Sequence, residues 1–230
     1  MTDRPELTGV AGVPETTLSR ALVDRLPENT APGPWECTLQ AVVWLARGGR
    51  AAAEALSPSL AGRAPAVLGG LVRYTGTPVG PYDEVLGLVV SGGLRPWGHV
   101  AFMAVDSEAS LVGGRTNWAM PKTLADFSGG VGRGTSFKAT GADEHRWRVG
   151  VTPTAVGPRL PLRLTGTARQ QFPAGRVGAS RLRGGGRVRP ALVRVEVESD
   201  GPLPSWLRPG RHLGAVVESA SFSLDAPETA

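Results

Sequence analysis

The sequence predicts a mainly β protein: a single-domain closed antiparallel β-barrel with a few short helices. Its 32 glycines and 20 prolines among 230 residues disfavour long helices, while 41% of the chain is hydrophobic. Short apolar runs between turn residues are typical of many strands joined by turns. At this length about 70% of the unfolded surface can be buried, which is enough for one core. We expect residues 1–30 to form an N-terminal arm and residues 31–230 the barrel domain.

The expected elements follow one another along the chain. Residues 18–26 allow a short helix, and the apolar run 38–46 (TLQAVVWLA) predicts a buried strand, although periodicity alone leaves a helix open. Residues 51–60 are rich in alanine and predict a short helix that ends at prolines. Further strands are expected over residues 65–73, 84–91, 99–106, 135–139, 146–151, 160–165, 191–198 and 213–223. Over residues 193–198 apolar and charged residues alternate, which is the pattern of a half-buried strand.

The formal net charge of +5 is unevenly distributed. Eleven arginines lie between Arg146 and Arg194, and no carboxylate lies between Glu144 and Glu196. This stretch could bind nucleic acid, attract an anionic substrate, or form a solvated face of an arginine-rich protein. Nucleic-acid surfaces interleave aromatic residues for base stacking, and this stretch has few. We therefore expect no nucleic-acid partner.

Several other classes of protein are also disfavoured. A single cysteine, Cys37, forms no intramolecular disulfide, and three scattered histidines argue against a zinc site. No apolar run approaches the roughly 18 residues of a membrane span, and no secretory signal begins the chain. We expect a cytoplasmic protein without a metal ion or membrane attachment.

Lys122 is one of only two lysines among 25 basic residues, and its neighbours Trp118, Met120 and Leu124 are apolar. A lysine can lose its proton, whereas an arginine cannot, and apolar surroundings disfavour the ammonium form. If Pro121 begins a short helix, the positive end of that helix acts in the same direction. A neutral amine attacks a ketone to give an iminium, which accepts electrons in decarboxylation and aldol chemistry. A surface lysine at the start of a helix is the alternative.

Two segments carry a family resemblance. Residues 114–124 (GRTNWAMPKTL) resemble the Schiff-base segment of the acetoacetate decarboxylase family. Residues 71–74 (LVRY) and 82–84 (YDE) are similar to the segment that leads to the family's active-site glutamate. The resemblance is specific over about residues 71 to 128. It implies an acetoacetate decarboxylase-like barrel with the lysine in its apolar interior, assembled as a homo-oligomer.

The resemblance also implies roles for individual residues. Lys122 would be the Schiff-base lysine and Glu84 the acid/base carboxylate of a cofactor-free lyase that acts on a small keto acid. Substrate-binding positions are expected at Tyr82, Arg115, Trp118 and Met120. Arg115 could hold the substrate carboxylate or instead donate to turn carbonyls. Decarboxylation and aldol-dehydration share every step up to the iminium, so both remain open.

The chain departs from the family pattern at three places. Thr123 follows the lysine where the decarboxylase has a second lysine, and residues 35–46 contain no arginine to hold a carboxylate. Thr75 stands where a second glutamate is expected. These departures favour an alternative function, a catalytically inactive barrel that binds a small apolar or anionic ligand.

Overall fold

The computed structural model describes residues 4–132 and 134–229. The strands are β1 (Trp35–Arg47), β2 (Ala66–Gly76), β3 (Tyr82–Ser91), β4 (Trp97–Val105), β5 (Lys122–Gly129), β6 (Phe137–Gly141), β7 (Trp147–Ala155), β8 (Leu160–Gln171), β9 (Val177–Ser199), β10 (Gly210–Leu224) and β11 (Glu228–Thr229). The α-helices are α1 (Pro5–Thr8), α2 (Arg20–Arg25), α3 (Arg50–Glu54), α4 (Glu108–Trp118) and α5 (Leu203–Leu207). Three short 3-10 helices are η1 (Pro14–Thr16), η2 (Pro58–Leu60) and η3 (Pro173–Gly175).

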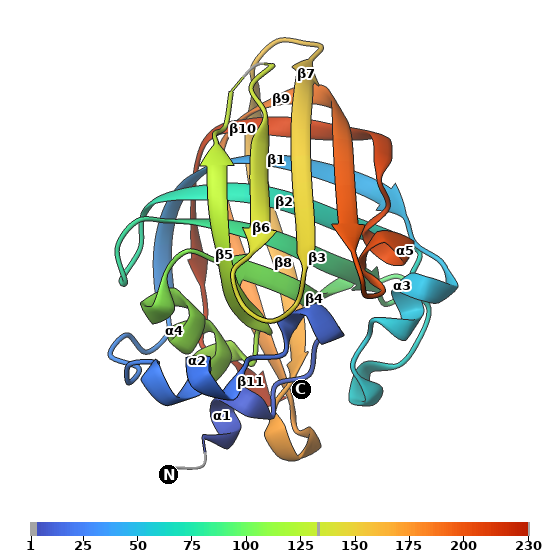
Figure 1. Cartoon of the computed structure of the whole chain (residues 1–230). Helices are drawn as coiled ribbons and strands as arrows, with labels where there is room; N and C mark the ends of the chain where they lie inside the picture. The colour runs from blue at the N-terminus through green and yellow to red at the C-terminus, as the bar shows by residue number, and fades with distance from the viewer. Residues whose placement is uncertain (1–3, 133, 230) are drawn as a thin grey trace.

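A single eleven-stranded sheet forms a ring (Figure 1). The strands pair in the order β10–β1–β2–β3–β4–β5–β6–β7–β9, and β9 pairs again with β10. Strand β8 lies beside β9 in antiparallel pairing and meets β4 at the pair Gly98 and Ala168. The prediction of a mainly β chain with few, short helices is confirmed.

The expectation of a wholly antiparallel sheet is wrong at β4. This strand runs parallel to β5, with Met103 opposite Lys122, and parallel to β8. Parallel neighbours need a connection that carries the chain back along the sheet. Here α4 makes that return, so the end of β4 and the beginning of β5 are joined by the helix.

The interior holds two hydrophobic clusters. The first contains Trp44, Phe102 and Trp206 and packs against α3. The second contains Trp35, Trp118 and many other residues from α1, α2, α4 and the strands next to them. Figure 1 shows α1, α2 and α4 together at one end of the ring and α3 with α5 at another side. The second cluster surrounds the candidate site described below.

Other local predictions differ from the structure in detail. The helix expected at residues 18–26 is α2, and its N-cap Ser19 accepts a hydrogen bond from the Leu22 amide. The helix expected at residues 51–60 is split into α3 and η2. Strand β9 begins fourteen residues earlier than residue 191, because residues 177–188 pair with β8 and residues 182–195 pair with β10. No helix within residues 4–132 and 134–229 has the length and apolar character that a bilayer crossing requires.

Close packing between β1 and β2 makes one glycine necessary. A Cβ on Gly69 would lie 2.1 Å from Cζ2 of the fully buried Trp44, whereas a Cβ on Gly70 would meet its nearest neighbours at 3.6 Å. We expect Gly69→Ala to lower the free energy of unfolding by about 3 kcal/mol, because overpacking displaces the indole. The neighbouring Gly70→Ala should change it by less than about 0.5 kcal/mol. Urea unfolding of both variants measures the difference, and equal effects would contradict the packing argument.

Candidate active site

Lys122 begins strand β5, immediately after the turn that ends α4. The turn depends on Ala119, whose φ of 51° lies in the left-handed region. The amides of Ala119 and Met120 donate back to the carbonyls of Arg115 and Gly114. The expectation that Pro121 starts a helix with Lys122 in its first turn is therefore wrong. Lys122 instead follows the C-terminal end of α4 and is the first residue of β5.

Gly114 provides the space in which the lysine side chain lies. A Cβ at this position would come within 2.6 Å of Lys122 Cε and 2.5 Å of Cδ. The aliphatic part of Lys122 thus lies directly against the backbone of α4. Any larger residue at position 114 would push the lysine away, which gives a physical reason for glycine in the segment 114–124.

The amino group of Lys122 has three polar neighbours. Nζ lies 2.9 Å from Glu84 Oε2, 2.8 Å from Ser110 Oγ and 3.4 Å from the Tyr82 hydroxyl. It also lies 5.0 Å from the centre of the Tyr82 ring. The side chains of Lys122 and Glu84 are only 4% and 2% exposed. The structure therefore brings together three residues predicted from the sequence, in a place almost closed to water.

Glu84 lies on strand β3, next to Asp83. Because successive side chains of a strand point to opposite faces, the two carboxylates lie on different sides of the sheet. Asp83 faces the outside and pairs with Arg73 at 2.6 Å, whereas Glu84 faces the interior. Glu84 Oε1 accepts a hydrogen bond from the Tyr74 hydroxyl at 3.3 Å. Because β3 and β5 both neighbour β4, Glu84 and Lys122 reach toward each other across that strand.

The buried pair of Lys122 and Glu84 is held by further hydrogen bonds. Removing two charges from water is costly, and their attraction offsets this only when hydrogen bonds satisfy the remaining atoms. Ser110 and Tyr74 supply those hydrogen bonds here. Transfer of the proton from Nζ to Glu84 gives two neutral groups, a free amine and a carboxylic acid. The two groups are therefore close enough for a proton to pass between them along a single hydrogen bond.

Arg115 is placed differently from the substrate-binding role considered for it. Its guanidinium is buried and donates to three backbone carbonyls, those of Lys122, Leu7 and Thr16. Burial lowers the pKa of Arg115 to about 9, so the group is still charged at neutral pH. Its side chain fastens the N-terminal segment to the start of β5. This is the alternative in which Arg115 donates to turn carbonyls, and we leave it out of the substrate-binding set.

The amino group faces a small cavity of about 130 Å³. An engineered cavity of about 150 Å³ in another protein holds benzene, so this volume suits a ligand of roughly six heavy atoms. Tyr82, Trp118 and Met120, all expected in the wall, line it together with Lys122 and Glu84. The other lining residues are Trp35, Cys37, Tyr74, Leu86, Leu88, Val100, Met103, Gly114, Ala168, Leu182, Phe222 and Leu224.

The cavity keeps its hydroxyl and thiol groups protonated. Burial, and after it the nearby Glu84, raises the pKa of Tyr74 and of Tyr82 well above the ordinary value. The same two causes raise the pKa of Cys37 to about 12. These groups can therefore donate hydrogen bonds at neutral pH without adding negative charge.

Cys37 should be inert in the folded protein. With a pKa of about 12, only about one thiol in 10⁴ is ionised at pH 8, and the thiolate is the reactive form. We expect iodoacetamide at pH 8 to leave native Cys37 unmodified for hours and to modify it fully in concentrated urea. Peptide mass spectrometry measures both states. Native labelling at the rate of free cysteine would contradict the described burial.

A family model described as Acetoacetate decarboxylase (ADC) matches residues 30–211, which include Glu84 and Lys122. The chain belongs to the acetoacetate decarboxylase family. The resemblance found in two short segments is therefore confirmed over most of the chain. No curated protein matches it.

Solved structures share the fold at low sequence identity. An acetoacetate decarboxylase-like enzyme from Sphingomonas wittichii RW1 has a TM-score of 0.69 at 16% identity, over 87% of this chain and 94% of that one. The enduracididine biosynthesis enzyme MppR, complexed with the condensation product of pyruvate and imidazole 4-carboxaldehyde, has a TM-score of 0.63 at 18% identity, over 86% and 90%. Acetoacetate decarboxylase from Legionella pneumophila subsp. pneumophila str. Philadelphia 1 has 0.58 at 14%, over 86% and 88%.

Three polar residues of this family member were missed by the sequence analysis. Tyr74 lies opposite Tyr82 in the β2–β3 hairpin, and pairing the two strands about their turn could have found it. Helix α4 places Ser110 against Nζ of Lys122, and strand β1 places Cys37 in the wall of the same cavity. No local pattern marks either residue, because only the tertiary fold places them at the lysine.

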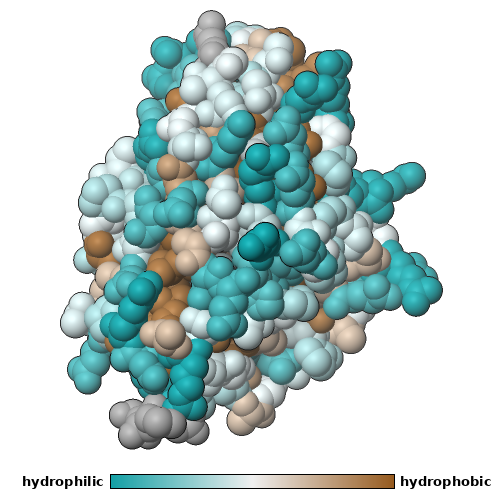
Figure 2. Space-filling view, in the orientation of Figure 1, coloured by the Kyte–Doolittle hydropathy of each residue, from teal (hydrophilic) through white to brown (hydrophobic). Residues whose placement is uncertain are grey.

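Most arginines of the arginine-rich stretch are exposed, although Ala168 and Leu182 of the same stretch line the cavity. The stretch runs over β7, β8 and β9, where several arginines form surface ion pairs, such as Arg148 with Glu198 and Arg189 with Glu218. Figure 2 shows that the face of the molecule turned to the viewer in Figure 1 is mostly hydrophilic, with hydrophobic residues in small groups between polar ones. Within residues 4–132 and 134–229, no three His, Cys, Asp or Glu side chains gather as a metal site would require.

Proposed function

We propose that this protein is a cofactor-free lyase that forms an imine between Lys122 and the carbonyl carbon of a small keto acid or a related ketone or aldehyde. The single observation that carries the proposal is the buried contact of 2.9 Å between Lys122 Nζ and Glu84 Oε2 beside an apolar cavity. Membership of a family that includes decarboxylases supports it, as does the complex of MppR with a condensation product of pyruvate and imidazole 4-carboxaldehyde.

The proposed chemistry begins with proton transfer from Nζ of Lys122 to Glu84. The free amine attacks the carbonyl carbon, forming a carbon–nitrogen bond, and the carbonyl oxygen takes up a proton from the attacking nitrogen. Glu84 then returns its proton, and the hydroxyl leaves as water. The products are one water molecule, an iminium cation and the Glu84 carboxylate that balances it. Dry surroundings protect the iminium from hydrolysis.

Two reactions diverge from the iminium. Loss of carbon dioxide from a β-keto acid transfers the bonding electron pair into the iminium and gives an enamine. Alternatively, loss of a proton beside the iminium gives an enamine that attacks an aldehyde, and dehydration follows. Both lie within the proposal. That the protein assembles as a homo-oligomer also remains a prediction, which sedimentation analysis would test.

Borohydride trapping tests the proposal. The protein is incubated with a panel of ketones, aldehydes and keto acids, reduced, and analysed as intact chain and as peptides. We expect a mass gain equal to the carbonyl compound less one oxygen atom, located on Lys122. The gain should be absent from Lys122→Ala and from the exposed Lys138 of the wild-type protein. Absence of any adduct on Lys122 across the panel would favour the alternative, a barrel that only binds ligands.

A further inference from the structure

The charges at the cavity limit what can bind there. Among the described residues that line it, Lys122 is the one cation and Glu84 the one anion, and the two form a pair. The cavity as a whole is therefore neutral. An iminium at Lys122 with a carboxylate at Glu84 keeps it neutral. A substrate carboxylate would make it negative, and an unpaired buried anion is strongly disfavoured.

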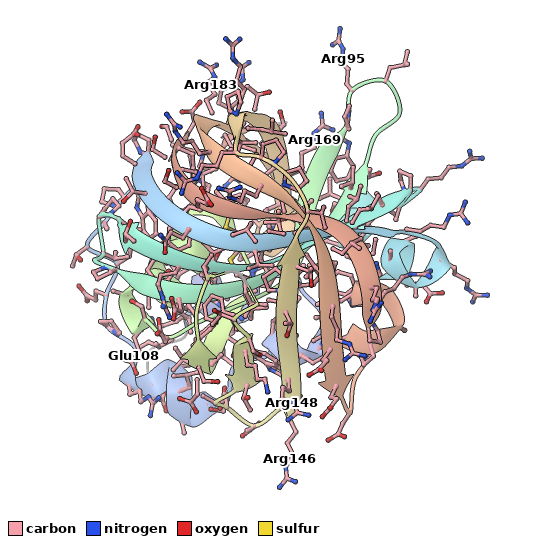
Figure 3. All side chains as sticks on the ribbon, turned by 90° about the horizontal axis from the view of Figure 1, so that it is seen from above. Arg95, Glu108, Arg146, Arg148, Arg169 and Arg183 are labelled. Atoms are coloured by element: carbon pink, nitrogen blue, oxygen red, sulfur yellow. The ribbon has the colours of Figure 1, made fainter. Side chains whose placement is uncertain are left out.

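Arginines close to the cavity do not supply the missing cation. The guanidinium of Arg115 contacts the carbonyl of Lys122, but it does not line the cavity and is engaged by three backbone carbonyls. Ala168 and Leu182 line the cavity, and alternation along β8 and β9 turns their neighbours to the opposite face. Accordingly, the Arg169 guanidinium lies 5.5 Å from the centre of the Trp97 indole, and the Arg183 side chain points away from the ring of strands (Figure 3).

The neutral donors at the cavity are also largely engaged. The Tyr74 hydroxyl donates to Glu84, and the indole N–H groups of Trp35 and Trp118 donate to the carbonyls of Ala31 and Asp225. The Tyr82 hydroxyl and the weakly donating Cys37 thiol remain for a ligand. A carboxylate accepts about four hydrogen bonds, so these two groups do not satisfy one.

The less buried part of the wall is apolar as well. Leu86, Leu88, Ala168 and Leu182 are half-buried, whereas Lys122 and Glu84 are almost completely buried. A ligand with its carbonyl at Nζ would therefore extend along leucine side chains. Burial of an aliphatic group against them is favourable, at about 25 cal/mol per Å² of apolar surface removed from water.

We infer that the imine-forming site selects a neutral ketone or aldehyde with a branched aliphatic substituent over a keto acid of the same shape. This inference rests on the proposed imine chemistry and narrows its substrate class. The covalent step is the same: the carbonyl loses its oxygen as water, and nitrogen takes its place. For such a substrate the reaction is aldol-type condensation or its reverse, since no carboxylate is present to leave as carbon dioxide.

Matched pairs of small molecules test the inference. Methyl isobutyl ketone has the shape of acetoacetate with two methyl groups in place of the carboxylate oxygens. Methyl isoamyl ketone has the same relation to laevulinate. Each compound is incubated separately with the wild-type protein and borohydride, and labelling of Lys122 is divided by that of N-acetyl-lysine amide, which corrects for intrinsic reactivity. If bound acetoacetate loses carbon dioxide before reduction, borohydride leaves an isopropyl group on Lys122. This adduct is counted as labelling by acetoacetate.

We expect the neutral member of each pair to label Lys122 at least tenfold more than the acid. A ratio near one, or a preference for the acids, would overturn the inference while leaving the imine chemistry intact. Absence of labelling by all four compounds and by the wider panel would instead remove the proposed function itself. The two failures are therefore distinguishable.

A charge substitution gives a second test. Leu182→Arg places a guanidinium at the half-buried wall, and Leu213→Arg makes the same change at an exposed leucine of β10 that does not line the cavity. We expect Leu182→Arg to shift the labelling ratio toward the acids by about tenfold and Leu213→Arg to leave it unchanged. If folded Leu182→Arg and the wild type gave the same ratio of labelling by the neutral ketone to labelling by the acid, charge in the cavity would not explain the selectivity.

Discussion

Replacing Glu84 by glutamine is expected to slow imine formation at Lys122 by about 10²–10⁴-fold, the usual range for losing a general acid–base group. Glutamine fills the same space and can still contact Nζ. It can neither accept the ammonium proton nor return a proton to the departing hydroxyl. The measurement is the rate of borohydride-trapped adduct on Lys122 with a single neutral ketone at pH 7.

The neighbouring Asp83→Asn is the matched control. It removes the same charge one residue earlier on β3, but from the outer face, where Asp83 pairs with Arg73. We expect its trapping rate to stay within about twofold of the wild-type rate, since Asp83 does not line the cavity and its carboxylate is paired with Arg73. A Glu84→Gln protein that labels as fast as the wild type would remove Glu84 from the proposed proton transfers.

Arg115→Lys is expected to lower the free energy of unfolding by about 3–5 kcal/mol. The planar guanidinium satisfies three buried carbonyls from separate parts of the chain. A lysine ammonium is a compact donor that cannot reach all three, and each buried polar group left unpaired costs about 1–3 kcal/mol. Urea unfolding at pH 7 measures the loss.

An exposed arginine provides the control for this substitution. Arg183 lies on the outer face of β9, so Arg183→Lys should change the free energy of unfolding by less than about 0.5 kcal/mol. Arg115 also donates to the carbonyl of Lys122. Borohydride trapping of an adduct on Lys122 should therefore be slower in Arg115→Lys than in the wild type, even under conditions where the variant is fully folded. A loss of stability below 1 kcal/mol would show that the three carbonyls find other partners.

Much of the strand pattern could be predicted from the sequence because half-buried strands alternate. Residues 193–198 show this most clearly and lie in β9. Helix α4 was missed because it contains Gly113 and Gly114, which are poor helix formers. Its N-cap Ser107 and its packing against the second cluster hold it instead. Local preference was overridden there by tertiary contacts.

The candidate site was only partly accessible to sequence reasoning. Lys122 and Glu84 stand out by residue type and by family resemblance. Their mutual contact could not be predicted, since it requires β3 and β5 to lie on either side of β4. The N-terminal carbonyls that Arg115 binds were equally hidden, because they are about a hundred residues away in the chain.

The ring has a consequence for the time at which the cavity is closed during synthesis. Trp35 and Cys37 at the start of β1 pair with Leu224 and Phe222 at the end of β10, and all four residues line the cavity. During synthesis β1 leaves the ribosome long before β10 exists. Until then this wall is missing and water reaches Lys122. The cavity beside Lys122 is therefore closed only when β10, the last large strand to be made, has been added to the ring.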